Sequence, residues 1–179
     1  MCIQMLDIEN YLILDTETTG IGNKDEVIEL GIINMDGQTV YHSLFKPNCP
    51  IHEKAAAVHG ITLSEVQDAP QFSEEWHNIK DVLKGKKILI YNASFDTRML
   101  NQTARIHSCK NILTKQGTHC VMTGYAKHHG QINPKTGQFR WIKLEQALKN
   151  EGISIVQSHR AIGDCLMTLS LIKKVGPIW

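Results

Sequence analysis

The sequence predicts an α/β fold in which helices flank a mixed β-sheet. Short apolar runs of strand length come first in the chain, at 11–15, 26–34 and 39–46. After residue 86, strand-length runs alternate with segments whose apolar residues recur at helical spacing. Strands followed by alternating strands and helices are typical of a sheet that helices cover. A chain of 179 residues is long enough for a substantial core, so we expect residues 1–179 to form one domain.

The second and third strands are expected to form a hairpin. The dipeptide Asp36-Gly37 between them is typical of a tight turn that joins antiparallel strands. Because this hairpin follows the first strand directly, we expect the three strands to pair as an antiparallel trio.

Helical periodicity and further apolar runs predict the remaining elements. Trp76, Ile79 and Leu83 lie on one face of the helix expected from Ser73 to Leu83, so Trp76 is interpreted as a core residue. The other expected elements are helices near 52–58 and 62–67, a strand at 87–91, a helix near 94–106, a short strand and helix within 118–127, and helices near 143–151 and 160–174.

Two acidic residues follow the first apolar run. Asp15 and Glu17 stand two residues apart, so on a strand their side chains point to the same face. Clustered carboxylates repel one another, and a hard divalent cation such as Mg²⁺ neutralises them through oxygen ligands. The alternative is a polar turn at the end of a strand, since Asp, Thr and Gly are common turn residues. The hexapeptide from Asp15 to Gly20 does not by itself decide between the two.

Two further aspartates stand near the beginnings of expected helices. Asp96 lies in the first turn of the helix that follows the strand at 87–91, and Ser94 is expected to cap that helix. Asp164 lies about one turn into the last helix, with His159 at its entrance. Taken singly, such an aspartate is usually solvated or interacts with the helix dipole, and such a histidine is usually a cap or a surface residue. Only the combination of motifs gives these residues a more specific meaning.

Taken together, these residues resemble the motifs of the DEDD superfamily of 3′–5′ exonucleases, in its DnaQ-like branch. Asp15, Glu17, Asp96 and Asp164 occur in the order of the four carboxylates of that family. His159, five residues before the last aspartate, is similar to the histidine of the DEDDh subgroup. The other subgroup has a tyrosine four residues before that aspartate, where this sequence has an arginine.

The resemblance covers nearly the whole chain and implies a ribonuclease H-like fold. The segments 58–62 and 68–72 also fit the pattern of the family. The motifs around Asp96 and Asp164 look most like those of exodeoxyribonuclease X and of polymerase proofreading domains.

The resemblance further implies a metal-dependent mechanism. Two Mg²⁺ or Mn²⁺ ions would be held by the four carboxylates, with Asp15 as the candidate to contact both. His159 would be the general base, because the ordinary pKa of an imidazole lies near neutrality.

The resemblance also implies contacts with the substrate. The candidate residues are Thr18, Thr19, Gly20, Ile21, His59 and Phe95. The first three would offer backbone groups to the terminal sugar, and Ile21 would separate the last two bases. His59 and Phe95 would contact a base or a sugar, although packing beneath the site is an alternative role for Phe95.

These motifs favour an exonuclease that removes nucleotides from single-stranded or frayed 3′ ends of DNA. RNA trimming by an oligoribonuclease-type enzyme is the alternative among enzymes, although Thr16 and Thr18 stand where a methionine is usual in those enzymes. A nucleic-acid-binding module without catalysis is the alternative from another class, and all four carboxylates argue against it. Only 15 residues follow Asp164, which favours a stand-alone enzyme over a subunit that docks to a polymerase through a C-terminal tail.

The segment from Gly130 to Trp141 has two interpretations. It is rich in turn-forming residues and ends in Phe139, Arg140 and Trp141. Basic and aromatic residues on a loop can bind single-stranded nucleic acid by stacking and phosphate contacts. The alternative, which we favour from the sequence, is a surface hairpin that Trp141 anchors to the core.

Composition limits the partners and the compartment. A net charge of +1 argues for a small footprint on a few nucleotides instead of a wide duplex-binding surface. The five cysteines contain no CxxC pair, so we expect free thiols in a reducing compartment and a cytoplasmic protein. Cys109, Cys120, His128 and His129 match no structural zinc spacing. The N-terminus lacks the basic region of a signal peptide, and no apolar run is long enough to span a membrane. The sequence does not reveal protein partners or the oligomeric state.

Overall fold

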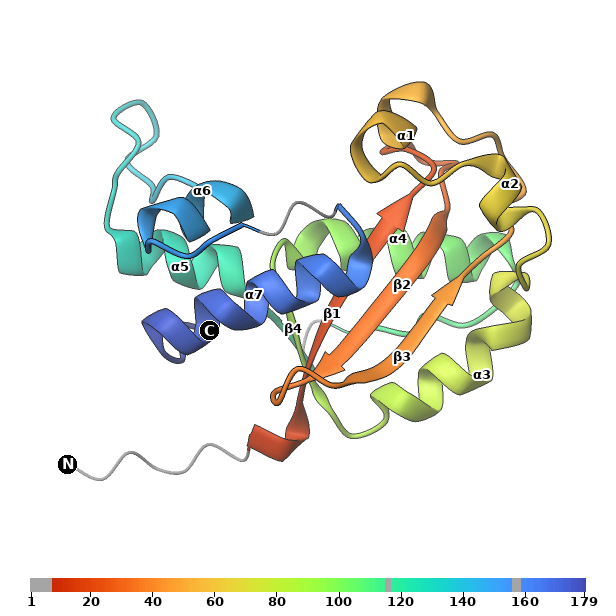
Figure 1. The fold of residues 1–179 in the computed structure, drawn as a ribbon, viewed down its shortest axis with the longest axis horizontal. Coiled ribbons are helices and arrows are strands. Elements are labelled where there is room, and N and C mark those ends of the chain that lie inside the picture. Colours follow the sequence, from red (N-terminus) through yellow and green to blue (C-terminus); the bar gives the residue numbers. More distant parts are fainter. Residues whose placement is uncertain (1–7, 115–116, 156–158) are drawn as a thin grey trace.

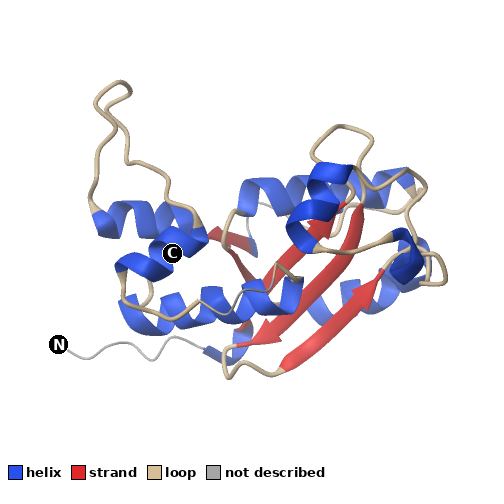
Figure 2. Ribbon diagram, turned by 45° about the horizontal axis from the view of Figure 1, so that its top comes forward, coloured by secondary structure: helices blue, strands red, loops and turns tan. Residues whose placement is uncertain are grey.

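The computed structural model describes residues 8–114, 117–155 and 159–179. Cys2 and the rest of the N-terminal segment interpreted above lie outside these residues. The core is a five-stranded sheet with helices on both faces (Figures 1 and 2). The strands are β1 (Tyr11–Thr18), β2 (Val27–Asn34), β3 (Thr39–Leu44), β4 (Lys87–Ile90) and β5 (Thr118–Cys120), in the spatial order β3-β2-β1-β4-β5.

The sheet is mixed, as the sequence predicts. β1 and β3 each pair with β2 in antiparallel fashion, which confirms the expected trio. β4 is parallel to both β1 and β5. Because β1 and β4 are parallel neighbours, their carboxyl ends meet at one edge of the sheet. β1 also extends beyond the expected 11–15, so Glu17 lies within the strand together with Asp15.

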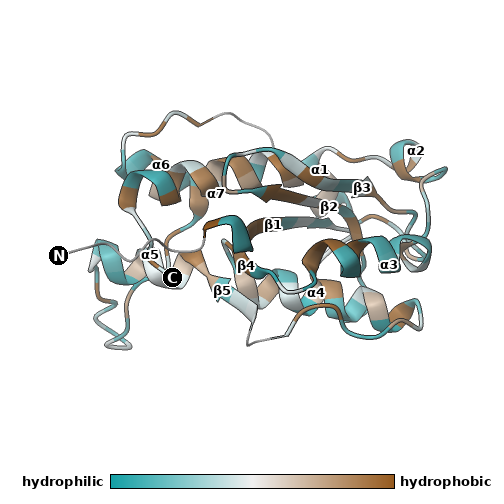
Figure 3. Ribbon diagram, turned by 90° about the horizontal axis from the view of Figure 1, so that it is seen from below, coloured by the Kyte–Doolittle hydropathy of each residue, from teal (hydrophilic) through white to brown (hydrophobic). Residues whose placement is uncertain are grey.

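The helices form two layers, one on each face of the sheet (Figure 3). They are α1 (Glu53–His59), α2 (Leu63–Val66), α3 (Phe72–Leu83), α4 (Ala93–Ile106), α5 (Val121–His129), α6 (Leu144–Asn150) and α7 (Ala161–Val175), preceded by a 3-10 turn at Ile8–Asn10. Leu12 and Leu14 pack with α3 and α4, whereas Tyr11 and Ile13 pack with α5, α6 and α7. Both faces of β1 are therefore buried, which explains its continuous apolar run. No described helix is both long enough and apolar enough to span a membrane.

Two local expectations are corrected by the structure. Ser94 does not cap α4, because the helix already begins at Ala93 with Asn92 at the N-cap position, and the Ser94 hydroxyl donates to the side-chain oxygen of Asn92 at 3.1 Å. Trp76 is only partly buried, because its indole N–H reaches outward to the carbonyl of Lys110 at 3.0 Å. Its ring still packs against the core formed by α3 and the sheet.

α7 lies very close to β2 because Gly31 has no side chain. A Cβ at Gly31 would stand 2.8 Å from backbone atoms of Ala161 and Ile162. The thiol of Cys165 in the same helix donates to the carbonyl of Gly31 at 3.5 Å. These contacts hold the first turns of α7 against the centre of the sheet, and they carry Asp164 toward β1.

Candidate active site

Three carboxylates converge where α7 meets the end of β1. Asp15 and Glu17 point to the same side of β1, as their spacing predicts, and Asp164 reaches them from α7. Each offers an oxygen, and these oxygens lie within 4.8 Å of one another. Among the described residues this is the one such group of potential metal ligands, and it draws on segments almost 150 residues apart in the chain.

Asp96 adjoins this group from α4 but is not part of it. Its carboxylate is buried, at 3% exposure, and accepts a hydrogen bond from the Thr16 hydroxyl at 2.8 Å. The contact places Asp96 beside β1, and its negative charge raises the pKa of Asp15. The four predicted carboxylates thus meet in one region, with three of them in the tightest contact.

Burial and mutual repulsion raise the pKa of every carboxylate in this region. For Asp15 the pKa lies well above its usual range, first because of burial and then because of the charges of Asp96, Asp164 and Glu17. Burial, followed by the charges of Asp164 and Glu29, raises the pKa of Glu17 to about 9. Burial raises the pKa of Asp96 to about 7, although the Thr16 hydrogen bond opposes it, and that of Asp164 to about 6. A nearby cation would therefore strongly stabilise the ionised form of these carboxylates.

One carboxylate oxygen gives a direct test of whether a cation fits. Oδ1 of Asp164 is buried without a hydrogen-bond partner among the described residues. An unsatisfied buried polar atom is costly, and native proteins normally provide a partner for it. An oxygen-only donor set with an orphaned carboxylate atom suits a hard divalent cation. The residues therefore fit the metal that their spacing predicts.

His159 lies just before α7, at the rim of the carboxylate group. Its Nε2 stands 3.4 Å from a carboxylate oxygen of Glu145 in α6, and both side chains are roughly half exposed. The positive charge of a protonated His159 lowers the pKa of Asp164, which places the imidazole in the field of the cluster. Glu145 did not stand out in the sequence, because a glutamate in the first turn of a surface helix is common.

The start of α7 is held by an ion pair that sequence analysis missed. Glu29 of β2 is buried, and both of its oxygens accept from Nε of Arg160 at 3.0–3.1 Å. The amide of Ala161 and the ring of His42 also contact this carboxylate, at 3.1 and 2.8 Å. Burial alone would raise the pKa of Glu29, but these hydrogen bonds hold it below its usual value. A lone glutamate inside the apolar strand 27–34 was the available signal, because a buried charge needs a partner.

A cleft of about 930 Å³ opens beside Glu17, between the end of β1 and α1. Five of the predicted substrate contacts line it: Thr18, Gly20, Ile21, His59 and Phe95. Ile21 is largely exposed at its rim, and Phe95 packs against the core as well as facing the cleft. Thr19 is not among the lining residues, because its side chain is fully buried and its hydroxyl donates to Asp25 at 2.9 Å.

His59 contacts the backbone through both ring nitrogens. The amide of Ile61 donates to Nδ1 at 3.0 Å, so the proton resides on Nε2, which donates to the carbonyl of Thr18 at 3.2 Å. Burial lowers the pKa of His59, which favours this neutral form. His59 therefore fixes the backbone that lines the cleft and presents only its ring to a ligand.

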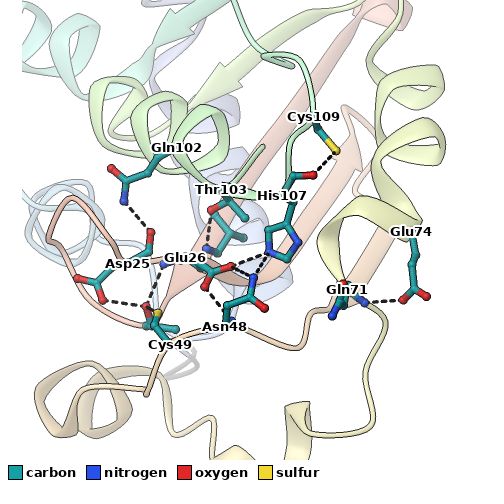
Figure 4. Close-up of polar contacts among 12 residues, drawn as sticks. Asp25, Glu26, Asn48, Cys49, Gln71, Glu74, Gln102, Thr103, His107 and Cys109 are labelled. Carbon is teal, nitrogen blue, oxygen red and sulfur yellow. Dashed lines mark hydrogen bonds and ion pairs between the residues drawn. The ribbon is translucent and has the colours of Figure 1, made fainter. Parts of the chain in front are cut away.

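A buried polar network holds the loop between β1 and β2 in place (Figure 4). Asp25 accepts from Thr19 and from the amide of Gly22 at 2.6 Å, and its carbonyl accepts from the Gln102 side chain of α4 at 2.6 Å. Glu26 contacts the ring of His107 at 2.6 Å, and the two side chains are nearly inaccessible. A fully satisfied buried network of this kind rigidifies its segment. The loop that forms one wall of the cleft is consequently preorganised.

Comparison with known proteins adds a family match. The RNase T family model, described as an exonuclease, matches residues 12–172. An uncharacterized exonuclease, CP81 of Escherichia phage 186, is 34% identical over 169 residues, which cover 92% of this chain and 87% of the relative.

Two further matches are more distant. DNA polymerase III subunit epsilon of Buchnera aphidicola is 32% identical over 108 residues, and the match spans 55% of this chain but only about half of the relative, 46%. A structure of exonuclease X in complex with 5′ overhanging duplex DNA superposes with a TM-score of 0.66 at 24% identity, covering 92% and 90% of the two chains. At that identity, the superposition shows a shared fold.

Proposed function

Since this chain belongs to the RNase T family of DnaQ-like exonucleases, we propose that it removes nucleotides one at a time from the 3′ ends of single-stranded or frayed DNA. The carboxylate group beside the cleft carries this proposal, because metal-assisted phosphodiester hydrolysis needs clustered oxygen ligands next to a site for the chain end. The match over residues 12–172 also favours a single exonuclease domain that spans residues 1–179.

Asp15, Glu17 and Asp164 would hold the metal, and Asp96, which accepts from Thr16 of β1, would complete the set. Mg²⁺ or Mn²⁺, as two ions, would supply Lewis-acid stabilisation of the charge that develops on the attacking and leaving oxygens. Among the described residues, Oδ1 of Asp164 is the buried side-chain oxygen without a hydrogen-bond partner, so it would be available to a metal ion.

We assign the proton transfer to His159. Its imidazole would accept the proton of the attacking water, and Glu145 at 3.4 Å would stabilise the resulting positive charge. The pair of Glu29 and Arg160 fixes the residue that follows His159, so it limits the directions from which the imidazole approaches the carboxylates.

The cleft would receive the 3′-terminal nucleotides. Thr18 and Gly20 lie along its wall next to Glu17, which suits recognition of a terminal sugar close to the metal ligands. The exposed side chain of Ile21 would pack between bases. Phe95, which also lines the cleft, would offer a ring to a base or a sugar.

DNA is favoured as the substrate because the relatives named above include a DNA polymerase subunit and an exonuclease bound to DNA. RNA trimming is the second candidate. Because recognition of ribose depends on contacts to the 2′-hydroxyl, matched DNA and RNA substrates are needed to separate the two. The unpaired thiols of Cys49, Cys109, Cys120 and Cys165 are compatible with a reducing compartment, and we propose a cytoplasmic location.

The test uses 5′-labelled DNA and RNA oligonucleotides of one sequence, offered single-stranded, blunt and with a mismatched 3′ end. We expect a ladder that shortens from the 3′ end, with faster cleavage of single-stranded and mismatched DNA than of blunt duplex, because fraying costs a few kcal/mol. Excess EDTA should abolish the activity, and Asp15→Ala should abolish it in the presence of Mg²⁺. Full activity in EDTA would refute the metal-dependent mechanism. Cleavage of a closed circle would refute an exonuclease, and faster cleavage of RNA would assign the chain to RNA trimming.

A further inference from the structure

The segment from Gly130 to Trp141 forms a hairpin that projects from the body of the protein between α5 and α6 (Figures 1 and 2). Ile132 and Phe139 face each other in an antiparallel bridge. The backbone closes through Asn133 to Gln138 at 2.8 Å and Arg140 to Gln131 at 2.8 Å. These bonds make the hairpin an ordered element with its own geometry.

Ile142, and not Trp141, anchors this hairpin. Trp141 is 69% exposed, which contradicts the anchoring role that the sequence favours. Ile142 is 7% exposed within the core, and its carbonyl accepts from the Tyr91 hydroxyl at 2.7 Å. The chain therefore passes from solvent into the core between Trp141 and Ile142.

The hairpin gathers exposed apolar side chains. Ile132 and Phe139 are opposed across the bridge and are 57% and 43% exposed. Trp141 follows Phe139 by two residues in the chain and is 69% exposed. Among the exposed large apolar residues of the described chain, Phe139 and Trp141 are the aromatic ones. Exposed aromatic side chains that gather in this way mark a binding surface.

Basic residues lie within and beside the hairpin. Residues 127–143 contain four lysines and arginines and no aspartate or glutamate, although the whole chain carries only +1. Lys135 and Arg140 belong to the hairpin, and Lys127 and Lys143 flank it; all four are exposed. None of them takes part in an ion pair with another described residue. A polyanion that also offers flat rings fits such a surface, whereas a second copy of this basic surface would be repelled.

The hairpin also ends close to the catalytic centre. Trp141 precedes Glu145 by four residues, so their Cα atoms are at most about 14 Å apart. Glu145 in turn contacts His159. At this distance, a strand with its 3′ end at the carboxylates would need only a few nucleotides to reach Trp141.

We propose that the exposed side chains of this hairpin, namely Ile132, Phe139 and Trp141 with Lys135 and Arg140, bind the single-stranded part of the substrate upstream of its 3′ end. The proposal rests on the proposed function, and it adds a second contact outside the cleft. Bases stack on the aromatic rings while the lysine and arginine neutralise phosphates. The contact would favour substrates long enough to reach from the cleft to the hairpin.

The test is a direct binding measurement in EDTA, where no cleavage occurs. Fluorescence anisotropy would follow labelled oligothymidylates of 4 and 20 nucleotides with the full chain. Trp141→Ala should weaken binding of the 20-mer about 5- to 100-fold, the usual value of one stacked base, and change binding of the 4-mer little. Trp141→Phe should restore most of the affinity, and Arg140→Ala should reduce the salt dependence for the 20-mer. Val40→Ala, which trims an exposed apolar residue on β3, is the matched control.

The outcomes separate this proposal from the proposed function. Equal affinities of the wild type and Trp141→Ala for the 20-mer would overturn the hairpin site even if 3′-end cleavage is observed. A loss of 20-mer binding in Trp141→Ala would support it even if no cleavage is detected. If Trp141→Ala instead converts a dimer to a monomer in analytical ultracentrifugation and leaves DNA binding unchanged, the hairpin is a self-association surface and the proposal fails.

Discussion

Replacing Asp164 by asparagine should stabilise the metal-free protein at neutral and alkaline pH. The folded protein holds this carboxylate among other negative groups, and burial raises its pKa from 3.8 to about 6. An acid whose pKa is raised by folding binds its proton more tightly in the folded state, so stability falls as the pH rises from about 4 to beyond 6. The amide introduced by Asp164→Asn is neutral throughout this pH range, so the variant avoids the free-energy cost of burying an ionised carboxylate.

The magnitude follows from the size of the shift. A change from 3.8 to about 6 corresponds to about 3 kcal/mol, at about 1.4 kcal/mol per pKa unit. Because Asp164 is only partly buried, solvent screening reduces this to about 2 kcal/mol. The variant also loses a carboxylate in the first turn of α7, which costs about 0.5 kcal/mol. A net gain of about 1.5 kcal/mol raises the melting temperature by about 3–6 °C for a chain of this size.

The assay is thermal unfolding in EDTA at several pH values, with Asp68→Asn as a control that removes one exposed negative charge. The melting temperatures of Asp164→Asn and the wild type should differ least near pH 4, where the carboxyl group is protonated in the folded state and only about half ionised in the unfolded state. At pH 8 the variant should melt at a higher temperature than the wild type. Mg²⁺ should reduce or reverse this difference in melting temperature, because the ion stabilises the wild type more than the variant. A variant that is less stable than the wild type at pH 8 in EDTA would refute the repulsion argument, as would a gain that is equal at pH 4 and pH 8.

Two further predictions follow from the site and the fold. His159→Ala should lower the cleavage rate about 10²–10⁴-fold, the usual contribution of a positioned general base. The Mg²⁺-induced rise in melting temperature should stay unchanged, and loss of that rise would show that His159 is a metal ligand. Gly31→Ala should destabilise the protein by about 1–3 kcal/mol in denaturant unfolding, because the new Cβ would stand 2.8 Å from the backbone of α7, and an unchanged midpoint would show that α7 can move away without cost.

Much of the site could be predicted before the structure was considered, because its chemistry is local in sequence. The i, i+2 spacing of Asp15 and Glu17 fixes their common side of a strand whatever surrounds it. The order of the strands and helices follows from hydrophobic periods of two and 3.6 residues, which short segments already display. The antiparallel trio follows from a short connection and a turn dipeptide.

Other features were decided by contacts between distant segments. The ion pair of Glu29 with Arg160 joins residues that are 131 positions apart. It could not be predicted from the sequence near Glu29, because it depends on where α7 crosses β2. From the sequence, Thr19 was expected to contact the substrate. In the structure its hydroxyl donates to Asp25 instead, and its side chain does not line the cleft.

The hairpin from Gly130 to Trp141 shows most clearly what could not be predicted from the sequence. From composition, Trp141 was the natural anchor, because large aromatic residues usually gain most from burial. The structure buries its neighbour Ile142 instead, among core residues of α5, α6 and α7. The sequence by itself thus determined which residue types stand at the site and in which local setting. Only the tertiary structure decided which of two adjacent side chains enters the core, because that choice depends on the space left between α5, α6 and the sheet.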